Sequence, residues 1–287
     1  MVGVLRVGCA MWTNPAWPGR SIPRTTASGA ELAAYSALLS AVEGNTTFYA
    51  LPTKAVAQRW AEATPEHFRF MFKLPKTITH DRKLRNCADE VGTFFRTLDP
   101  CLPKMDPVAI QLPASFGPDS LNVLESFMRA APTMVRYGVE VRHPDFFDGG
   151  AQERSLNDLL ATFGADRIIF DSRAVFAGPR ITPAEHEAFE NKPRLPVRAV
   201  ATSTTPIVRF IGQTNPDANP TFWEPWVQTV VRWLRDDRSP IVFIHTPDNA
   251  AAIDLSRQFY DEVRAYVPEL AAQPDAPLVT EATLFNQ

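Results

Sequence analysis

The sequence predicts a single (β/α)8 barrel, and three observations lead to that prediction. Short runs of β-branched and apolar residues recur along the chain, with segments of helical periodicity between them. There are eight such runs, and their starts lie about 34 residues apart on average, which suits eight βα units in a barrel of this size. The first run continues into GCAMWTNPAWPG, which lacks the glycine-rich turn expected of a doubly wound nucleotide-binding sheet.

Each expected element rests on its local pattern. The expected strands, which are rich in β-branched and apolar residues, are 4–9, 41–45, 68–73, 107–112, 137–142, 167–171, 206–211 and 241–245. The expected helices, whose apolar residues recur at helical spacing, are 31–39, 55–63, 90–98, 120–130, 155–163, 222–234 and 251–266. Thr53 is the expected N-cap of the second helix, and Asp119 or Ser120 that of the fourth. Residues 178–206 are rich in proline, so we expect a long, partly irregular loop with a short helix near 184–190.

The domain organisation predicted is one barrel followed by a tail. The 26 prolines are spread over loops and do not gather into a linker, so residues 1–267 are expected to form one domain. Residues 268–287 are expected to form a C-terminal extension that packs on or near the barrel and ends in the apolar pair Leu284 and Phe285.

Composition excludes several classes of function. The 29 Lys and Arg residues are balanced by 32 Asp and Glu residues, so a nucleic-acid partner is not expected. No run of about 18 apolar residues exists, so no membrane partner is expected. Cys9, Cys87 and Cys101 are far apart and form no CxxC pair, which favours a reducing, cytoplasmic location. The oligomeric state stays open, because apolar helix faces serve cores and interfaces alike.

Polar residues close nearly every expected strand. Catalytic groups of such barrels come from the carboxyl ends of the strands and the loops after them. The polar residues at these ends are Glu43, Asn45, Lys73, Gln111, Glu140, Arg142, His143, Asp171, Arg209 and His245. Side chains two apart on a strand share a face, so Glu43 with Asn45, and Glu140 with Arg142, are expected to point together into the barrel mouth.

These residues predict an enzyme that acts on a small anionic, phosphorylated or carboxylated, metabolite by acid/base chemistry. Lys73, Arg142 and Arg209 would hold the anion. The candidate catalytic residues are Glu43, Glu140, Asp171 and His80. The candidate substrate-binding residues are Asn45, Tyr49, Lys73, Gln111, Arg142, His143, Arg209, His245 and Trp12. Hydrolase, lyase and isomerase chemistry are not distinguished at this level.

Three alternatives remain open. The charged set could form an ion network that closes the barrel and does no chemistry. It could serve a non-catalytic protein that binds an anion. The histidines and carboxylates are also the ligand types of a divalent metal, as in a metal-dependent nuclease or sugar-phosphate isomerase. No metal-ligand spacing is visible in the sequence, so no metal site and no cofactor are expected.

Several long motifs resemble one known family. The stretches VGCAMWTNPAWPG, VEGNTTFYALP, RWAEATPEHFRFMFKLPKTITH, VAIQLPASFGP, VEVRHPDFF and IVRFIG, in this order, resemble the YecE-like family, also called domain of unknown function 72. The resemblance implies a single TIM-barrel domain but no particular reaction. It implies as pocket residues Glu43, Asn45, Phe48, Tyr49, Lys73, Thr79, His80, Gln111, Glu140, Arg142 and His143.

The chain departs from the family pattern on two strands. The seventh strand usually reads Arg-Leu-His-Gly in the family, whereas Ile211 stands here at the histidine position. The eighth strand usually ends in Phe-Asn-Asn, whereas His245 follows Phe243 and Ile244 here. We expect His245 to compensate in space for the missing histidine, with its ring turned toward Arg209.

Overall fold

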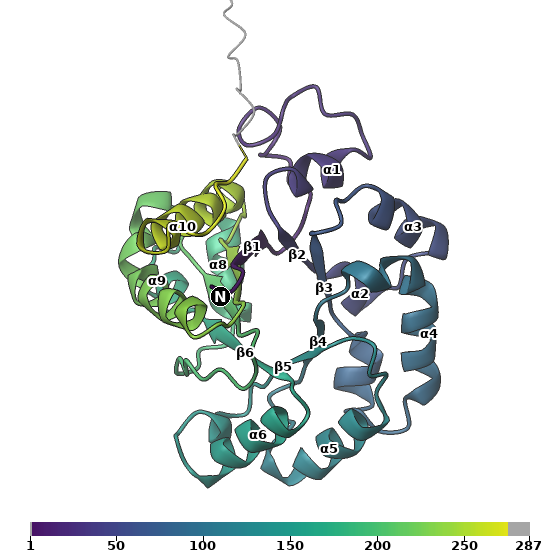
Figure 1. Cartoon of the computed structure of the whole chain (residues 1–287). Helices are drawn as coiled ribbons and strands as arrows, with labels where there is room; N and C mark the ends of the chain where they lie inside the picture. The colour runs from purple at the N-terminus through teal and green to yellow at the C-terminus, as the bar shows by residue number, and fades with distance from the viewer. Residues whose placement is uncertain (1, 275–287) are drawn as a thin grey trace, which may run out of the picture.

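The computed structural model describes residues 2–274 and confirms the predicted (β/α)8 barrel (Figure 1). The strands are β1 (Arg6–Cys9), β2 (Ala41–Gly44), β3 (Arg69–Phe72), β4 (Val108–Gln111), β5 (Tyr137–Glu140), β6 (Asp166–Asp171), β7 (Ile207–Ile211) and β8 (Ile241–His245). They lie side by side in the order β3-β2-β1-β8-β7-β6-β5-β4, and every ladder between neighbours is parallel. All eight expected strands are therefore present.

The barrel closes between β3 and β4 through isolated bridges. Phe70 pairs with Met105, and Lys73 pairs with Ala109. The amide of Leu74 donates to the carbonyl of Ala109 over 2.9 Å at the carboxyl end of this seam. The seam therefore holds the barrel together with fewer backbone hydrogen bonds than the ladders on either side of it.

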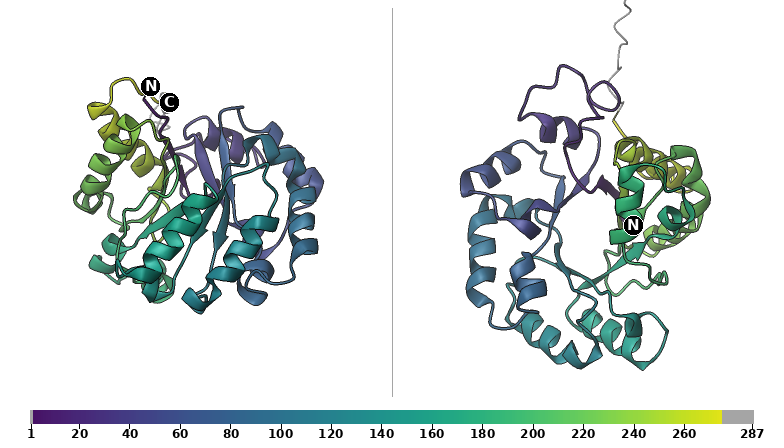
Figure 2. Two further views of the ribbon diagram at one scale, coloured as in Figure 1. Left: turned by 60° about the horizontal axis from the view of Figure 1, so that its bottom comes forward. Right: turned by 180° about the vertical axis from the view of Figure 1, so that it is seen from behind.

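Helices surround the strands on the outside (Figure 2). The longer helices are α3 (Lys54–Glu62), α4 (Ala88–Leu98), α5 (Leu121–Ala130), α6 (Ala151–Thr162), α8 (Pro183–Asn191), α9 (Pro220–Arg235) and α10 (Ala252–Tyr266), and the shorter ones are α1 (Glu31–Ser36), α2 (Thr46–Tyr49) and α7 (Arg173–Ala177). Thr53 caps α3 as expected, because its side chain accepts from the amide of Val56. No side-chain cap is present at Ser120, because the 3-10 turn Pro118–Ser120 leads directly into α5.

The segment between β6 and β7 departs from the regular pattern of the barrel. Ala188 of α8 packs with Phe170, Val175 and Ile211 in a small cluster that is separate from the main core. Phe170 and Ile211 lie on the inner face of the barrel wall, so α8 lies over the mouth of the barrel. The chain then returns to β7 through residues 192–206, which form no helix or strand. The expected long irregular loop and its short helix are thus both present.

Side chains that point into the barrel form two layers. The deeper layer is apolar and consists of Ala41, Met71, Ala109, Ile168, Ile207, Ile241 and Phe243. Because side chains alternate along a strand, the next inward positions lie two residues nearer the carboxyl end. These positions hold the polar residues Glu43, Lys73, Gln111, Arg209 and His245, with Glu140 on β5, whereas the position on β6 holds Phe170. The apolar layer therefore forms a floor beneath a polar layer at the carboxyl end.

The described start of the expected C-terminal extension packs on α10. Leu270 is buried with the main core, and the hydroxyl of Tyr260 donates to the carbonyl of Ala271 over 2.9 Å. Leu284 and Phe285 lie outside the described residues, and so does the contact expected of them. Within residues 2–274, no helix has the length and apolarity required to cross a bilayer.

Close packing of β1 against β2 gives a test of this architecture. A Cβ added at Gly8 would lie 2.1 Å from the carbonyl oxygen of Ala41, and neither backbone can move without breaking the ladder. Gly8→Ala is expected to lower the free energy of unfolding by about 3 kcal/mol in urea denaturation. Gly29→Ala is the control, since no atom lies within 4 Å and only a positive φ opposes it, which costs about 1 kcal/mol. Equal stabilities of the two variants would contradict the packing described.

Candidate functional site

A cavity of about 790 Å³ opens at the carboxyl end of the barrel. This volume lies within the range of about 300–1,000 Å³ that is typical of small-molecule sites. The polar layer forms its base, and the loops after β1, β2, β5, β6 and β8 form its walls. Its lining includes Met11, Trp12, Glu43, Asn45, Phe48, Tyr49, Lys73, Gln111, Arg142, Phe170, Glu187, Asn191, Lys192, Arg209 and His245.

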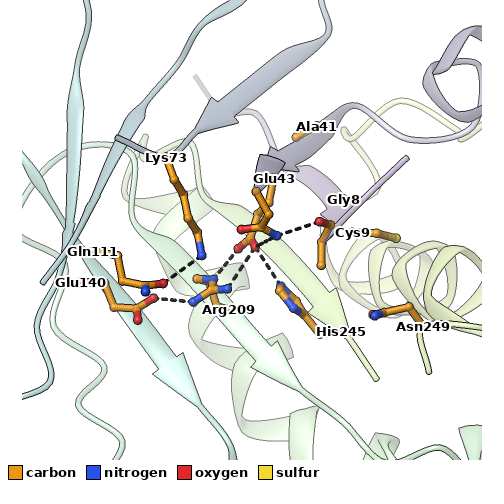
Figure 3. Close-up of polar contacts among 12 residues, drawn as sticks. Gly8, Cys9, Ala41, Glu43, Lys73, Gln111, Glu140, Arg209, His245 and Asn249 are labelled. Carbon is orange, nitrogen blue, oxygen red and sulfur yellow. Dashed lines mark hydrogen bonds and ion pairs between the residues drawn. The ribbon is translucent and has the colours of Figure 1, made fainter. Parts of the chain in front are cut away.

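Arg209 lies at the centre of the base, between two buried carboxylates (Figure 3). Its Nε and Nη2 donate to the carboxylate of Glu43, the second over 3.1 Å, and its Nη1 donates to Oε2 of Glu140. None of the three residues is more than 4% exposed. Two carboxylates share one guanidinium, so these three side chains together carry one net negative charge.

The two carboxylates are held in the ionised form. Burial alone would raise the pKa of Glu43, but Arg209 and His245 oppose it and keep the pKa well below its usual value. Burial also acts to raise the pKa of Glu140, but Arg209 and Arg142 outweigh it and lower the pKa to about 2. Arg142 contributes by donating from Nε to Oε1 of Glu140 over 2.9 Å. Both expected catalytic carboxyls are therefore weak bases at neutral pH.

Lys73 occupies the inward position just after β3 and is 7% exposed. Its ammonium donates to Oε1 of Gln111 over 2.9 Å, and this neutral amide is its one hydrogen-bond partner within residues 2–274. Burial and the nearby Arg209 lower the pKa of Lys73 to about 7, against the opposing effect of Glu43 and Glu140. At neutral pH the amine is therefore divided between its protonated and its neutral form.

His245 ends β8 with its ring beside Glu43, as Figure 3 shows. Its Nε2 lies 3.3 Å from Oε2 of Glu43, but the angles do not make a hydrogen bond. Burial lowers the pKa of His245 to about 4 in spite of Glu43, so the ring is neutral at pH 7. The backbone of His245 pairs with that of Ile211 on β7. The ring thus lies next to the Glu43–Arg209 pair, and Ile211, at the position of the missing family histidine, is its backbone neighbour on β7.

Three other residues expected to bind substrate also line the cavity. Asn45 donates to the carbonyl of Ala10 over 2.7 Å and to Oε2 of Glu43 over 3.2 Å, so it orients the carboxylate from above. Tyr49 and Trp12 stand at the mouth, where Tyr49 is 81% exposed.

The structure places Asp171 outside the cavity, although it ends β6. Its carboxylate accepts from Nε1 of Trp226 over 2.7 Å and from the side chain of Arg173, so it faces the outer helices. Side-chain alternation explains this, because Phe170, the residue before Asp171, points inward. The expectation of an inward Asp171 is corrected accordingly, and we assign this residue a structural role.

Two histidines expected at the site also lie outside the cavity lining. His143 begins the turn Pro144–Phe146, where its Nδ1 accepts from the amide of Asp145. His80 lies in a π-helical turn, Thr77–Asp81, with its ring edge-on to Phe48 at 5.1 Å between centroids. His80 therefore supports the cavity wall from behind.

The contribution of α8 to the cavity was not predicted from the sequence. Glu187, Asn191 and Lys192 line the cavity from the helix over the mouth and from its end. The sequence does not indicate that these residues line the cavity, because the site was predicted from polar residues at strand ends and the proline-rich segment 178–206 contains no strand end.

Metal-ligating residues do not gather at this site. Within residues 2–274, no group of three or more His, Cys, Asp and Glu side chains is arranged to hold a metal ion. At the base of the cavity, Arg209 engages both oxygens of Glu43 and Oε2 of Glu140, and Arg142 engages Oε1 of Glu140.

The fold and this site define a class: (β/α)8 barrel proteins with a charged cavity at the carboxyl end of the strands. A family model described as "Protein of unknown function DUF72" matches residues 6–278. The chain belongs to the DUF72 family, as the motif resemblance implied. It is 39% identical over 282 residues to the UPF0759 protein YecE of Escherichia coli K12, which covers 98% of this chain and 100% of that protein. A YecE protein of Escherichia coli O157:H7 matches to the same extent.

Solved structures of the family share the fold. A DUF72 family protein of Enterococcus faecalis V583 superposes with a TM-score of 0.68 at 16% identity, covering 94% of this chain and 99% of that one. A DUF72 family protein of Thermotoga maritima MSB8 also superposes with a TM-score of 0.68, at 20% identity, covering 91% of this chain and 99% of that one. At these identities the similarity supports the barrel fold alone.

The central ion cluster predicts a large effect of removing its cation. Arg209→Met would leave Glu43 and Glu140 buried without their main partner, which is expected to cost about 3–5 kcal/mol of unfolding free energy at pH 7. The loss should shrink toward pH 5, because burial raises the pKa of the orphaned carboxyls and they take up protons. Urea denaturation at both pH values measures this. Adding Glu43→Gln to Arg209→Met should recover part of the loss, and a failure to do so would contradict the pairing.

His245 predicts a pH dependence of stability. Its folded pKa of about 4 lies below the unfolded value near 6.5, so the unfolded chain binds this proton first as the pH falls. The stability contributed is therefore complete above about pH 6.5 and is lost toward pH 4, by at most about 3 kcal/mol. His245→Gln should flatten this slope in urea denaturation. His67→Gln, at an exposed position, should keep it, and equal slopes in the two variants would contradict the assignment.

Proposed function

We propose that this protein is an enzyme that transfers a proton on a small anionic metabolite, with Lys73 as the proton-transferring group. The observation that carries the proposal is the state of Lys73 at the base of the cavity. Its amine is buried, faces the cavity and makes one hydrogen bond to a neutral amide. A general base or acid works best when its pKa lies near the working pH, and the pKa of Lys73 is about 7.

The other titratable groups of the cavity base suit this role less well. Glu43 and Glu140, which the strand-end pattern indicated as the acid and base, are bound to Arg209 and have lowered pKa values. His245 is neutral, and its pKa is about 4. In this proposal the two glutamates and Arg209 fix the positions of the side chains at the bottom of the cavity. They also determine the electrostatic potential around Lys73, while Gln111 orients the amine.

The anion of the substrate is assigned to cations with donors to spare. Arg209 is engaged by two carboxylates, so it adds little net attraction for a ligand. Arg142 is bound on one side to Oε1 of Glu140, is partly exposed, and lines the cavity. The walls also carry Lys192, which comes from the end of α8. An oxyanion held by these side chains would place the rest of a small metabolite above Lys73.

The proposed step is a reversible proton transfer. The neutral amine of Lys73 takes a proton from a C–H or O–H bond of the substrate, whose electron pair stays on the substrate. The ammonium formed is stabilised by the nearby negative charge of the Glu43–Arg209–Glu140 cluster. In an isomerase, the proton, or one exchanged from solvent, then returns to the same or a neighbouring atom. In a lyase, the electron pair forms a double bond while the bond to the leaving group breaks, and the ammonium of Lys73 protonates the leaving group.

Solvent-isotope exchange tests this proposal across many candidate substrates at once. The purified protein is incubated in D2O with pools of phosphorylated and carboxylated metabolites, and mass spectrometry detects compounds that gain deuterium or change in mass. We expect at least one such compound, with a rate that rises through about pH 7 as Lys73 loses its proton. Lys73→Met should abolish the exchange.

The control is Lys54→Met, which removes an exposed lysine on α3 that pairs with Asp99 over 3.1 Å. It should leave the exchange unchanged. A metabolite that binds and is recovered without exchange or conversion would instead identify a non-catalytic anion-binding protein. Exchange that needs an added divalent metal and survives Lys73→Met would favour the metal-dependent alternative.

A further inference from the structure

The cavity has two chemically different walls. In the strand order of the barrel, β5 lies four strands from β1, and β6 lies four strands from β2, so these pairs face each other across the mouth. Trp12 follows β1, whereas Phe48 and Tyr49 follow β2. Arg142 follows β5, and Lys192 ends the helix inserted after β6. Aromatic rings therefore line one side of the mouth, and the other side carries these two cations together with Phe170 and the carboxylate of Glu187.

Lys192 is the cation on this wall with the most charge to spare. It is half-buried, and within residues 2–274 its ammonium makes no hydrogen bond or ion pair. Arg142, by comparison, is 2.8 Å from the carboxylate of Glu140. A partly desolvated ammonium without a partner is unfavourable, and an anionic ligand would relieve that cost. Burial lowers the pKa of Lys192, and the positive charge of Arg209 lowers it further. The charges at the base of the cavity therefore act on this residue.

The aromatic wall offers open ring surface. Tyr49 is 81% exposed, and its one aromatic neighbour within residues 2–274 is Phe48, whose ring meets it edge-on at 5.1 Å. Trp12 packs edge-on against Trp60, also at 5.1 Å. Both rings line the cavity. An aromatic side chain this exposed at a cavity mouth gains by stacking on a flat group of a ligand.

We propose that the cavity binds a ligand in which a flat ring carries an oxyanion, and that Lys192 is the residue that selects the oxyanion. The ring lies against Tyr49 and Trp12, and the carboxylate or phosphate lies against Lys192 and Arg142. This inference deepens the proposed function and rests on it for the location of the site, but it concerns recognition and not proton transfer. The cavity, at about 790 Å³, has room for both groups above Lys73.

Binding of simple probes tests the inference. Calorimetric titration compares phenyl phosphate, benzoate, inorganic phosphate and benzyl alcohol at fixed ionic strength. We expect phenyl phosphate or benzoate to bind at least tenfold more tightly than both inorganic phosphate and benzyl alcohol, and the tighter of the two identifies the oxyanion. Lys192→Met should weaken the best probe about tenfold or more and leave benzyl alcohol unchanged. Lys192→Arg should retain most of the affinity.

Matched variants separate the two walls. Tyr49→Ala should weaken the probes that carry a ring and leave inorganic phosphate unchanged. Arg59→Met, which removes an exposed cation on α3, controls for net charge and should bind like the wild type. Thermal melting of each variant verifies that it is folded.

Three results would overturn the inference: no binding of any probe, binding of inorganic phosphate or benzyl alcohol as tight as that of both phenyl phosphate and benzoate, or wild-type affinity for the best probe in Lys192→Met. Its failure is distinguishable from failure of the proposed function. Probe binding with the expected pattern, but no isotope exchange with any metabolite, would support the ligand class and overturn proton transfer. Exchange that depends on Lys73 but not on Lys192 would support proton transfer and overturn the proposed ligand class.

Discussion

The site depends on one interaction, the bonding of the Arg209 guanidinium to two buried carboxylates. Burying a charge is costly unless it is paired and hydrogen-bonded, and here each member satisfies the others. The pairing links β2, β5 and β7 across the interior of the barrel. The same cluster also influences the protonation of Lys73. The positive charge of Arg209 lowers the pKa of Lys73, whereas the negative charges of Glu43 and Glu140 raise it.

Strand geometry determines which residues meet there. The apolar positions Ala41, Met71 and Ile207 form the floor of the barrel, and the residue two places later on each strand joins the polar layer. That rule is readable in the sequence wherever a strand changes from apolar to polar inward positions. It accounts for the correct expectation that Glu43 and Arg209 lie inside the barrel.

The same rule misleads on β6, where the polar residue at the strand end lies on the outer face. The inward position two places after Ile168 holds Phe170, so Asp171 points outward, toward Trp226. The orientation of loop residues is not predictable for another reason, since the alternation of side chains along a strand does not extend into the loops. His143 and His80 follow polar strand ends, but His143 bonds to the backbone of a turn and His80 packs against Phe48 behind the cavity wall. Lys192 lines the cavity from a proline-rich segment. Their positions follow from tertiary packing that a single sequence does not encode locally.

The placement of α8 separates one wall of the cavity from the main core of the barrel. Because the helix rests on a small apolar cluster of its own and not on the main core, substitutions along it perturb few of the contacts that hold the barrel together. Substitutions in this helix can therefore alter the lining of the cavity while the polar layer at its base and the surrounding barrel stay unchanged.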